Sequence, residues 1–336
     1  MSNTLVDIKN LSVSYFTYAG EVQSVRDVSF TIEKGKTTAL VGESGCGKSV
    51  TSKSLMGLIE KPGKIKEGSQ IIYNGTDILK FTEKQWQDFR GKECSMIFQD
   101  ALVSLNPTMK IGKQIVENIA NHNVDNLPQG ELRKKAVDML KMVGIPDAEA
   151  CLEKYPHELS GGMRQRVMIA TAMITRPNLL IADEPTTALD VTIQAQILEL
   201  MQSLQKELGM AIIMTTHDLG VVAQMCDEVI VMYAGSICEQ GTADEIFYNP
   251  KHEYTKGLMR SIPTVDNDDQ KLEPISGTPI DLLNMPAGCP FAPRCDAAMK
   301  ICLRERCQRM QINDWHQAAC WVNVKEAAEK EGGEAE

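Results

Sequence analysis

One stretch decides the fold of this chain: Gly42-Glu43-Ser44-Gly45-Cys46-Gly47-Lys48-Ser49. Its outer glycines, lysine and hydroxyl follow the phosphate-binding loop pattern, in which backbone N–H groups wrap a phosphate. Lys48 would supply a positive charge, and Ser49 would offer a hydroxyl to Mg²⁺. The run 37–41 before the loop predicts a short buried strand, and residues 48–59 after it predict a helix. These flanks favour a phosphate site over the alternative, a plain glycine-rich turn.

Four more short motifs follow the loop in a fixed order: Ile97-Phe98-Gln99-Asp100, Leu159-Ser160-Gly161-Gly162-Met163-Arg164-Gln165-Arg166, Leu179-Leu180-Ile181-Ala182-Asp183-Glu184-Pro185 and Thr215-Thr216-His217-Asp218. Asp183 ends a predicted buried strand, where a carboxylate is costly unless it meets a cation such as Mg²⁺. Ser160 and two glycines precede a predicted helix and leave N–H groups for an anion. Taken singly, Ser160 also reads as an ordinary helix N-cap, and a lone histidine such as His217 as a structural residue.

Together the five motifs resemble the ATPase subunit of ATP-binding cassette (ABC) transporters, and the resemblance covers roughly residues 1–265. It implies that the chain binds and hydrolyses ATP with Mg²⁺ as cofactor. Glu184 would be the general base that polarises the attacking water, His217 would contact the γ-phosphate, and Gln99 would touch Mg²⁺ and water. The implied Mg²⁺ ligands are Ser49, Gln99 and Asp183. The implied ATP-binding residues are Tyr15, Gly42, Ser44, Gly45, Cys46, Gly47, Lys48, Ser49, Val50, Gln99 and Asp183.

The same resemblance implies a composite site between two ATPase subunits. The signature residues Ser160, Gly161, Gly162 and Gln165 would close on ATP held by the opposite subunit. Asp190, in Thr187-Ala188-Leu189-Asp190, would lie in the loop that crosses the dimer interface. Tyr15 would stack on adenine, although Phe16 and Tyr18 lie close in sequence and a strand aromatic more often belongs to the core.

Alternating strands and helices predict an α/β fold: a P-loop ABC ATPase domain with a parallel-sheet core, an antiparallel β subdomain and a helical subdomain. We expect this domain to cover residues 1–262, with the helical subdomain at about 100–170. An Asp-rich linker over 263–285 would lead to a Cys-rich C-terminal module over 286–323. An acidic tail would follow over 324–336.

Five of the ten cysteines crowd the C-terminal end: Cys289, Cys295, Cys302, Cys307 and Cys320. A cytosolic chain has little use for disulfides, so the crowd indicates a soft-metal site or reduced thiols. The segment resembles the C-terminal extension of the ATPase subunits of dipeptide and oligopeptide importers. That resemblance implies a [4Fe–4S] cluster on Cys289, Cys295, Cys302 and Cys320, with Cys307 as an extra thiol. Because the segment is far in sequence from every nucleotide motif, we expect that loss of the cluster does not abolish nucleotide binding.

Composition limits the other classes of function. A net charge of −10 over 336 residues argues against a nucleic-acid-binding surface. No apolar run is long enough to span a bilayer and no secretory signal is seen, so we expect a cytosolic chain. The resemblance implies that it lies as a peripheral subunit on the cytoplasmic face of the membrane. The resemblance supplies the partners: a second, paralogous ATPase subunit, two membrane permeases and an extracytoplasmic peptide-binding protein.

The predicted function is therefore ATP hydrolysis that powers the import of dipeptides or oligopeptides. Two alternatives stay open: an importer ATPase for another ligand, such as nickel or glutathione, and a non-transport ABC ATPase. DNA-repair ATPases of the second kind carry long coiled-coil insertions, whereas only about 60 residues separate Gln99 from Ser160.

Overall fold

The computed structural model describes residues 3–100, 104–122, 126–186, 190–261 and 274–326. The chain forms two compact units: unit 1 holds residues 1–5, 32–37 and 77–215, and unit 2 holds residues 6–31, 38–76 and 216–336. The predicted linker over 263–285 and the predicted tail over 324–336 lie partly outside the described residues.

Unit 1 is built on three parallel strands in the order β9–β8–β7. They are β7 (Cys94–Ile97), β8 (Leu179–Asp183) and β9 (Ala211–Thr216). Every residue of these strands is buried, which matches strands of a parallel sheet covered on both faces. In such a sheet the carboxyl ends of the strands share one edge, so side chains that follow them meet there.

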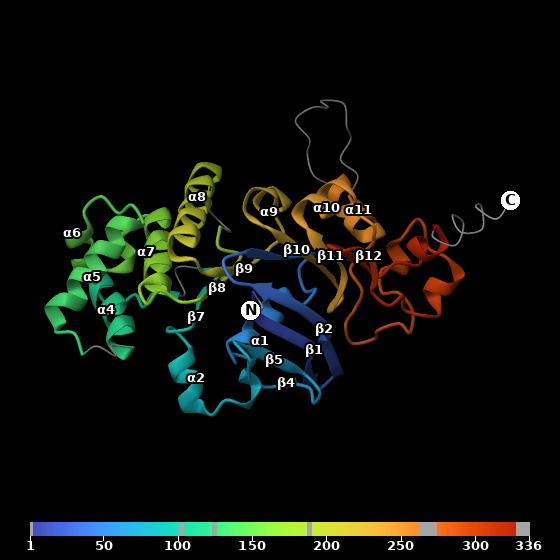
Figure 1. The fold of residues 1–336 in the computed structure, drawn as a ribbon, viewed down its shortest axis with the longest axis horizontal. Coiled ribbons are helices and arrows are strands. Elements are labelled where there is room, and N and C mark those ends of the chain that lie inside the picture. Colours follow the sequence, from blue (N-terminus) through green and yellow to red (C-terminus); the bar gives the residue numbers. More distant parts are fainter. Residues whose placement is uncertain (1–2, 101–103, 123–125, 187–189, 262–273, 327–336) are drawn as a thin grey trace. The chain divides into compact units, whose positions relative to one another are not determined.

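Helices make up most of the remainder of unit 1. The helix α4 buries Ile111, Ile115 and Ile119, which recur every four residues and form one apolar face. Gly144, two residues after the end of α5, has φ 77°, a left-handed conformation that is common just beyond a helix C-terminus. Figure 1 shows α4, α5, α6 and α7 packed as a helical cluster. The helical elements are η1 (Ile78–Lys80), α2 (Glu83–Phe89), α4 (Ile111–Asn121), α5 (Gln129–Met142), α6 (Ala148–Glu153), η2 (Pro156–Glu158), α7 (Gly161–Met173) and α8 (Val191–Leu208).

Unit 2 carries the predicted antiparallel β sheet, in which strands run in the order β2–β1–β5–β6 and β4 also pairs with β1. The strands are β1 (Thr4–Thr17), β2 (Gly20–Glu33), β4 (Gly63–Ile65), β5 (Gln70–Tyr73) and β6 (Thr76–Asp77). The alternating apolar and polar stretches 5–8 and 11–15 both belong to the long strand β1, and the stretch 28–32 belongs to β2. The inward-facing apolar residues, such as Val6, Ile8, Val13 and Val28, are fully buried.

A second set of strands in unit 2 places the phosphate-binding loop. The strand β3 (Thr37–Val41) is wholly buried and runs parallel to β10 (Glu228–Tyr233), which pairs antiparallel with β11 (Ser236–Thr242). The helix α1 (Lys48–Leu55) begins directly after the loop and ends four residues before the predicted limit. The remaining helices of this part are α9 (Leu219–Met225), α10 (Ala243–Tyr248) and α11 (Glu253–Arg260).

The C-terminal segment is tied into this sheet. The strand β13 (His316–Ala318) pairs with β11, and β12 (Met310–Asn313) pairs with β13. Two short 3-10 turns, η3 (Ala292–Arg294) and η4 (Lys300–Leu303), precede them. Whereas the sequence suggested a separate small module over 286–323, the structure uses part of it to extend the sheet that contains β3.

A buried carboxylate fastens the C-terminal strands to the sheet. Glu239 of β11 is fully buried and accepts hydrogen bonds from His316 Nε2 at 2.6 Å, Lys251 N at 2.6 Å and His252 N at 2.9 Å. The other ring nitrogen of His316 lies 3.1 Å from Glu245 Oε2. Burial alone would raise the pKa of Glu239, but the hydrogen bonds, led by that from His316, hold it below its ordinary value.

Acidification is expected to destabilise this region through His252. Burial lowers the pKa of His252 to about 4 from an ordinary 6.5, and its Nδ1 accepts the Tyr254 N–H in the first turn of α11. Between pH 6.5 and pH 4, His252 is therefore protonated in the unfolded chain and neutral in the folded chain. The stability that depends on neutral His252 is fully present above pH 6.5. Below that pH the free energy of unfolding falls by about 1.4 kcal/mol per pH unit, down to about pH 4.

The measurement is the urea unfolding midpoint between pH 7 and pH 4.5 for the wild-type protein and for His252→Asn. Asparagine retains an N-cap acceptor but cannot be protonated, so the variant should lose part of the pH dependence. An identical pH profile in the two proteins would contradict the assignment.

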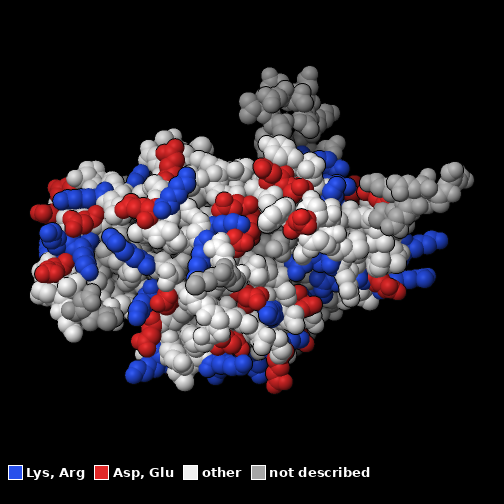
Figure 2. Space-filling view, in the orientation of Figure 1, with Lys and Arg blue, Asp and Glu red and all other residues white. Residues whose placement is uncertain are grey.

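The visible face of the protein mixes charges of both signs. Figure 2 shows Lys and Arg side chains interspersed with Asp and Glu over this face. Within the described residues, no helix combines the length and the apolar character needed to cross a bilayer.

Candidate nucleotide-binding site

The phosphate-binding loop of unit 2 has a backbone that only glycine permits at key positions. Gly42 has φ 146°, and a Cβ there would lie 2.2 Å from the carbonyl oxygen of Met232. Gly47, immediately before α1, has φ 103°, and a Cβ there would lie 2.4 Å from the carbonyl oxygen of Ser24. Glycine is therefore required at these two positions by the close approach of neighbouring backbone as well as by dihedral angle.

Lys48 is held against this loop. Its Nζ donates to the carbonyl oxygens of Gly42 at 2.6 Å and Glu43 at 3.0 Å, and the side chain is buried. Ser44 and Gly45 are exposed, whereas Ser49 and Val50 are half-buried in the first turn of α1. Burial raises the pKa of the Cys46 thiol, so this residue is a neutral packing group whose contribution to the loop is its backbone.

In unit 1 the carboxyl ends of the parallel strands bring together three of the predicted site residues. Asp183, the last residue of β8, is buried and accepts a hydrogen bond from the Thr215 hydroxyl on β9. Glu184 follows with φ 47°, and its N–H donates to the carbonyl oxygen of Thr215 at 3.0 Å. Gln99, two residues after β7, donates from Nε2 to Glu184 Oε2 at 2.9 Å. The motifs do not mark Thr215 as a partner of Asp183.

The signature motif begins α7. Ser160 is its N-cap and accepts from Met163 N at 3.3 Å, so the plain capping role holds alongside any role toward a ligand. A Cβ on the exposed Gly161 would meet no atom within 4 Å, whereas a Cβ on Gly162 would lie 3.1 Å from Ile193. Gln165 is buried and donates to the carbonyl oxygen of Pro185, which links this helix to the segment after Glu184.

The remaining predicted residues are placed individually. Asp190 is the N-cap of α8 and accepts from Ile193 N at 2.9 Å, while the three residues before it lie outside the described residues. His217 is exposed and directly follows β9. Tyr15 is half-buried on β1 opposite Gly63, and burial raises its pKa. The adenine role of Tyr15 stays a prediction.

The structure also shows a contact that the sequence patterns did not indicate. Arg294, in η3 of the C-terminal segment, forms a two-pronged ion pair with Glu43 of the phosphate-binding loop. The C-terminal segment is thus far from the phosphate-binding loop in sequence but contacts it in space. The expectation that loss of the cluster does not abolish nucleotide binding stays a prediction.

The five C-terminal cysteines are free thiols that lie close enough to influence one another's ionisation. Burial raises the pKa of Cys289, Cys295, Cys307 and Cys320, with Cys295 and Cys307 at about 11. Across the described residues, no group of three or more His, Cys, Asp or Glu side chains is arranged to hold a single metal ion.

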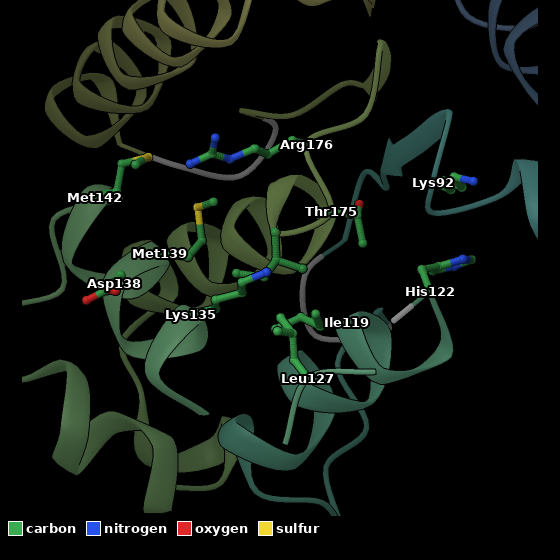
Figure 3. A pocket seen from close by; sticks show the side chains of 11 residues that line it. Lys92, Ile119, His122, Leu127, Lys135, Asp138, Met139, Met142, Thr175 and Arg176 are labelled. Atoms are coloured by element: carbon green, nitrogen blue, oxygen red, sulfur yellow. The ribbon is translucent and has the colours of Figure 1, made fainter. Parts of the chain in front are cut away.

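One cavity of unit 1, beside the helical cluster, is separate from these motifs. It has a volume of about 530 Å³ and is bordered by Lys92, His122, Lys135, Asp138 and Arg176. Figure 3 shows these side chains around the cavity, with Met139 and Met142 on α5. None of the predicted nucleotide-site residues lines it.

Known families match both the region that carries the nucleotide motifs and the C-terminal region. The family described as ABC transporter matches residues 25–187, and the family described as oligopeptide/dipeptide transporter, C-terminal region, matches residues 238–302. A third family, described as an AAA domain, putative AbiEii toxin, Type IV TA system, matches residues 153–223.

Several known proteins resemble the chain over nearly its whole length. The oligopeptide transport ATP-binding protein OppD of Bacillus subtilis is 52% identical over 98% of this chain and 92% of its own. The dipeptide transport ATP-binding protein DppD of Lactococcus lactis is 51% identical over 95% of this chain and 90% of its own. The oligopeptide transport ATP-binding protein OppD of Salmonella typhimurium is 48% identical over 90% of this chain and 89% of its own.

Solved structures share the fold. The ATP-binding cassette MJ0796, described as a dimer in a post-hydrolysis state with ADP and Pi, has a TM-score of 0.64 and 25% identity. The match covers 71% of this chain and 98% of that one. The cbiO1 protein of Clostridium perfringens, part of the transporter complex cbiONQ, has a TM-score of 0.63 and 30% identity. That match covers 74% of this chain and 92% of the other. The predicted ABC ATPase fold with mixed α/β content is confirmed.

Proposed function

The chain belongs to the family of oligopeptide and dipeptide transport ATP-binding proteins of ABC transporters, and from this we propose that it hydrolyses ATP to power the import of dipeptides or oligopeptides. The observation that carries the proposal is the convergence of Gln99, Asp183 and Glu184 at the ends of β7 and β8. Phosphoryl transfer to water requires polar groups of this kind, namely a carboxylate ligand for a cation and a general base for the attacking water.

Each residue has a distinct proposed task. Backbone N–H groups of the loop 42–47 bind the phosphates, and the positive charge of Lys48 stabilises the β- and γ-phosphates. Glu184 accepts the proton of the attacking water, and Gln99 orients the Glu184 carboxylate through the bond at 2.9 Å. His217 contacts the γ-phosphate.

The residues present suit Mg²⁺. Asp183 is a buried carboxylate at a strand end, supported by the Thr215 hydroxyl, and Ser49 and Gln99 offer neutral oxygens. Hard oxygen ligands of this kind are those that Mg²⁺ prefers. When bound, Mg²⁺ would neutralise charge on the β- and γ-phosphates. Asp183, Ser49 and Gln99 would hold it.

Transport also requires partners that span the membrane. We propose a second ATPase subunit, two permeases and an extracytoplasmic peptide-binding protein, with this chain at the cytoplasmic face. The test is uptake of a radiolabelled tripeptide into vesicles that contain the complete complex. Uptake should need ATP on the side of the membrane that carries this chain and should stop when Glu184 is replaced. Hydrolysis that responds to a non-peptide ligand and never to peptides would contradict the proposal.

We further propose that the C-terminal cysteines hold a [4Fe–4S] cluster. Nearby backbone N–H groups act to lower the pKa of Cys289, Cys295 and Cys320 against the larger effect of burial, and Met299 N donates to Cys302 Sγ at 3.4 Å. Donors of this kind stabilise thiolates and tune clusters. Cys307 instead donates from Sγ to the carbonyl oxygen of Gln308 at 3.3 Å, as a neutral thiol does. A cluster spreads its ligands over four irons, so they need not converge on one point.

Replacement of Cys289 by Ser is expected to remove the cluster, whereas Cys307→Ser should retain it. Protein purified without oxygen should be brown and contain about four irons per chain. Cys289→Ser should be colourless and should expose residues after 286 to protease, because the bound cluster would supply folding energy there. Iron content and visible absorbance are the measurements. One zinc per chain, or no metal, in anaerobic wild-type protein would contradict the cluster.

A further inference from the structure

Arg294 reaches the phosphate-binding loop from the C-terminal segment. Its Nη1 lies 2.6 Å from Glu43 Oε2, and its Nη2 lies 2.9 Å from Glu43 Oε1. Nε donates to the carbonyl oxygen of Ser276 at 2.9 Å, and only 4% of the Arg294 side chain is exposed. A planar guanidinium fixed at both edges holds a carboxylate in one orientation, which a flexible lysine would not do.

Glu43 is held at two further points. Its N–H donates to the hydroxyl of the buried Tyr254 at 2.8 Å, and its carbonyl oxygen accepts from Lys48 Nζ at 3.0 Å. Tyr254 packs against Tyr233 and Phe291, with ring centroids 4.7 Å and 5.3 Å away. Phe291 belongs to the same turn as Arg294, so both the backbone and the carboxylate of Glu43 are fixed by one local structure.

The C-terminal segment meets the loop at a second place. Residues 279–282 and the loop residues 43–46 line a common cavity of about 270 Å³. Leu282 also accepts a backbone hydrogen bond from Gln23 at 3.4 Å. The segment therefore lies beside the loop over an extended stretch, and the ion pair is part of that contact.

Charge gives the ion pair a consequence for nucleotide binding. A loop that receives the phosphates of ATP gathers several negative charges, and a carboxylate within the loop repels them. Only 26% of the Glu43 side chain is exposed, so solvent screens it incompletely. The guanidinium of Arg294 offsets this charge and restricts the motion of the carboxylate.

We propose that Arg294 is a positioning residue for ATP binding: by pairing with Glu43 it fixes and neutralises the phosphate-binding loop, so that the C-terminal segment sets nucleotide affinity. The inference rests on the proposed ATP-binding function of this loop. Arg294 and the C-terminal segment lie outside all five nucleotide motifs, so the inference gives the segment a role that those motifs do not indicate.

The test is a double-mutant cycle on the purified full-length protein, read as the Kd for a fluorescent ATP analogue with Mg²⁺. Arg294→Gln should weaken binding about tenfold, because Glu43 is left unpaired beside the phosphates. Arg294→Lys should lie between this variant and the wild type, since it keeps the charge and loses the fork. In the double variant Arg294→Gln, Glu43→Gln, binding should recover to within about threefold of the wild type.

Arg309 supplies a matched control in the same segment. Its guanidinium donates to Gln240 Oε1 and to the carbonyl oxygen of Ser29, and neither acceptor belongs to the phosphate-binding loop. Arg309→Gln should leave the Kd within about twofold of the wild type, whatever its effect on the thermal midpoint without nucleotide.

The outcomes separate this inference from the proposed function. Wild-type affinity in Arg294→Gln, or a double variant as weak as the single one, would overturn the inference while ATP binding stands. A wild-type protein that does not bind the analogue would instead contradict the proposed function itself.

Discussion

Replacement of Glu184 by Gln is expected to lower ATP hydrolysis by about a hundredfold or more while ATP binding persists. The change removes the charge that accepts a proton and keeps the shape of the side chain. Gln99 can still donate a hydrogen bond to the new amide oxygen, as it does to Glu184 Oε2. The φ of 47° and the bonds to Thr215 involve the backbone, so the substitution does not disturb them.

Single-turnover hydrolysis and nucleotide binding should be measured on the same preparation. Because binding uses the loop 42–49 and hydrolysis needs the base, the variant should retain ATP and accumulate as a dimer visible by size-exclusion chromatography. Glu199→Gln on α8 is a matched control, since that carboxylate is exposed and lies outside the site. Hydrolysis at the wild-type rate in Glu184→Gln would remove Glu184 from the role of base.

Replacement of Lys48 tests ATP binding, whereas replacement of Glu184 tests hydrolysis. Its ammonium group is the charged group fixed to the loop carbonyls of Gly42 and Glu43, so Lys48→Ala should weaken ATP binding itself. Comparison of the two variants distinguishes loss of binding from loss of chemistry.

The nucleotide motifs could be predicted from sequence because each is short and local. Continuous buried runs before Gly42 and up to Asp183 predicted parallel strands, and parallel strands deliver the residues after them to one edge. The meeting of Gln99 with Glu184 follows from that rule and from the adjacency of β7 and β8.

The C-terminal region could not be predicted in the same way. Its strands β12 and β13 have four and three residues, too few to show a period of two. The partners of His316 and Arg294 are Glu239 and Glu43, which are 77 and 251 positions away. Such pairs depend on how the chain returns to the sheet, and no local pattern encodes them. The contact between Arg294 and the phosphate-binding loop could not be foreseen for this reason.

A carboxylate placed in the signature motif is expected to abolish hydrolysis at the partner's site. The structure favours Gly161→Asp over Gly162→Asp for this test, because a Cβ on Gly162 would lie 3.1 Å from Ile193, whereas nothing lies within 4 Å of one on Gly161. A carboxylate at the start of α7 also suits the helix dipole, and α7 has no acidic residue in its first turn. Loss of activity in Gly161→Asp would therefore not reflect misfolding of its own subunit.

Complementation between two inactive variants shows whose ATP the signature serves. Gly161→Asp keeps an intact phosphate-binding loop, and Lys48→Ala keeps an intact signature. If the signature acts across a dimer, a mixed dimer pairs the good loop with the good signature and recovers up to about a quarter of wild-type activity, since half of the dimers are mixed and each has one sound site. If the signature served its own subunit, neither chain would hold a complete site. The mixture would then stay as inactive as its parts, and the trans assignment of Ser160, Gly161, Gly162 and Gln165 would be wrong. Where the active pair needs a paralogous partner, Gly161→Asp in this chain should stop turnover of ATP on the partner's loop and leave ATP binding to its own loop unchanged.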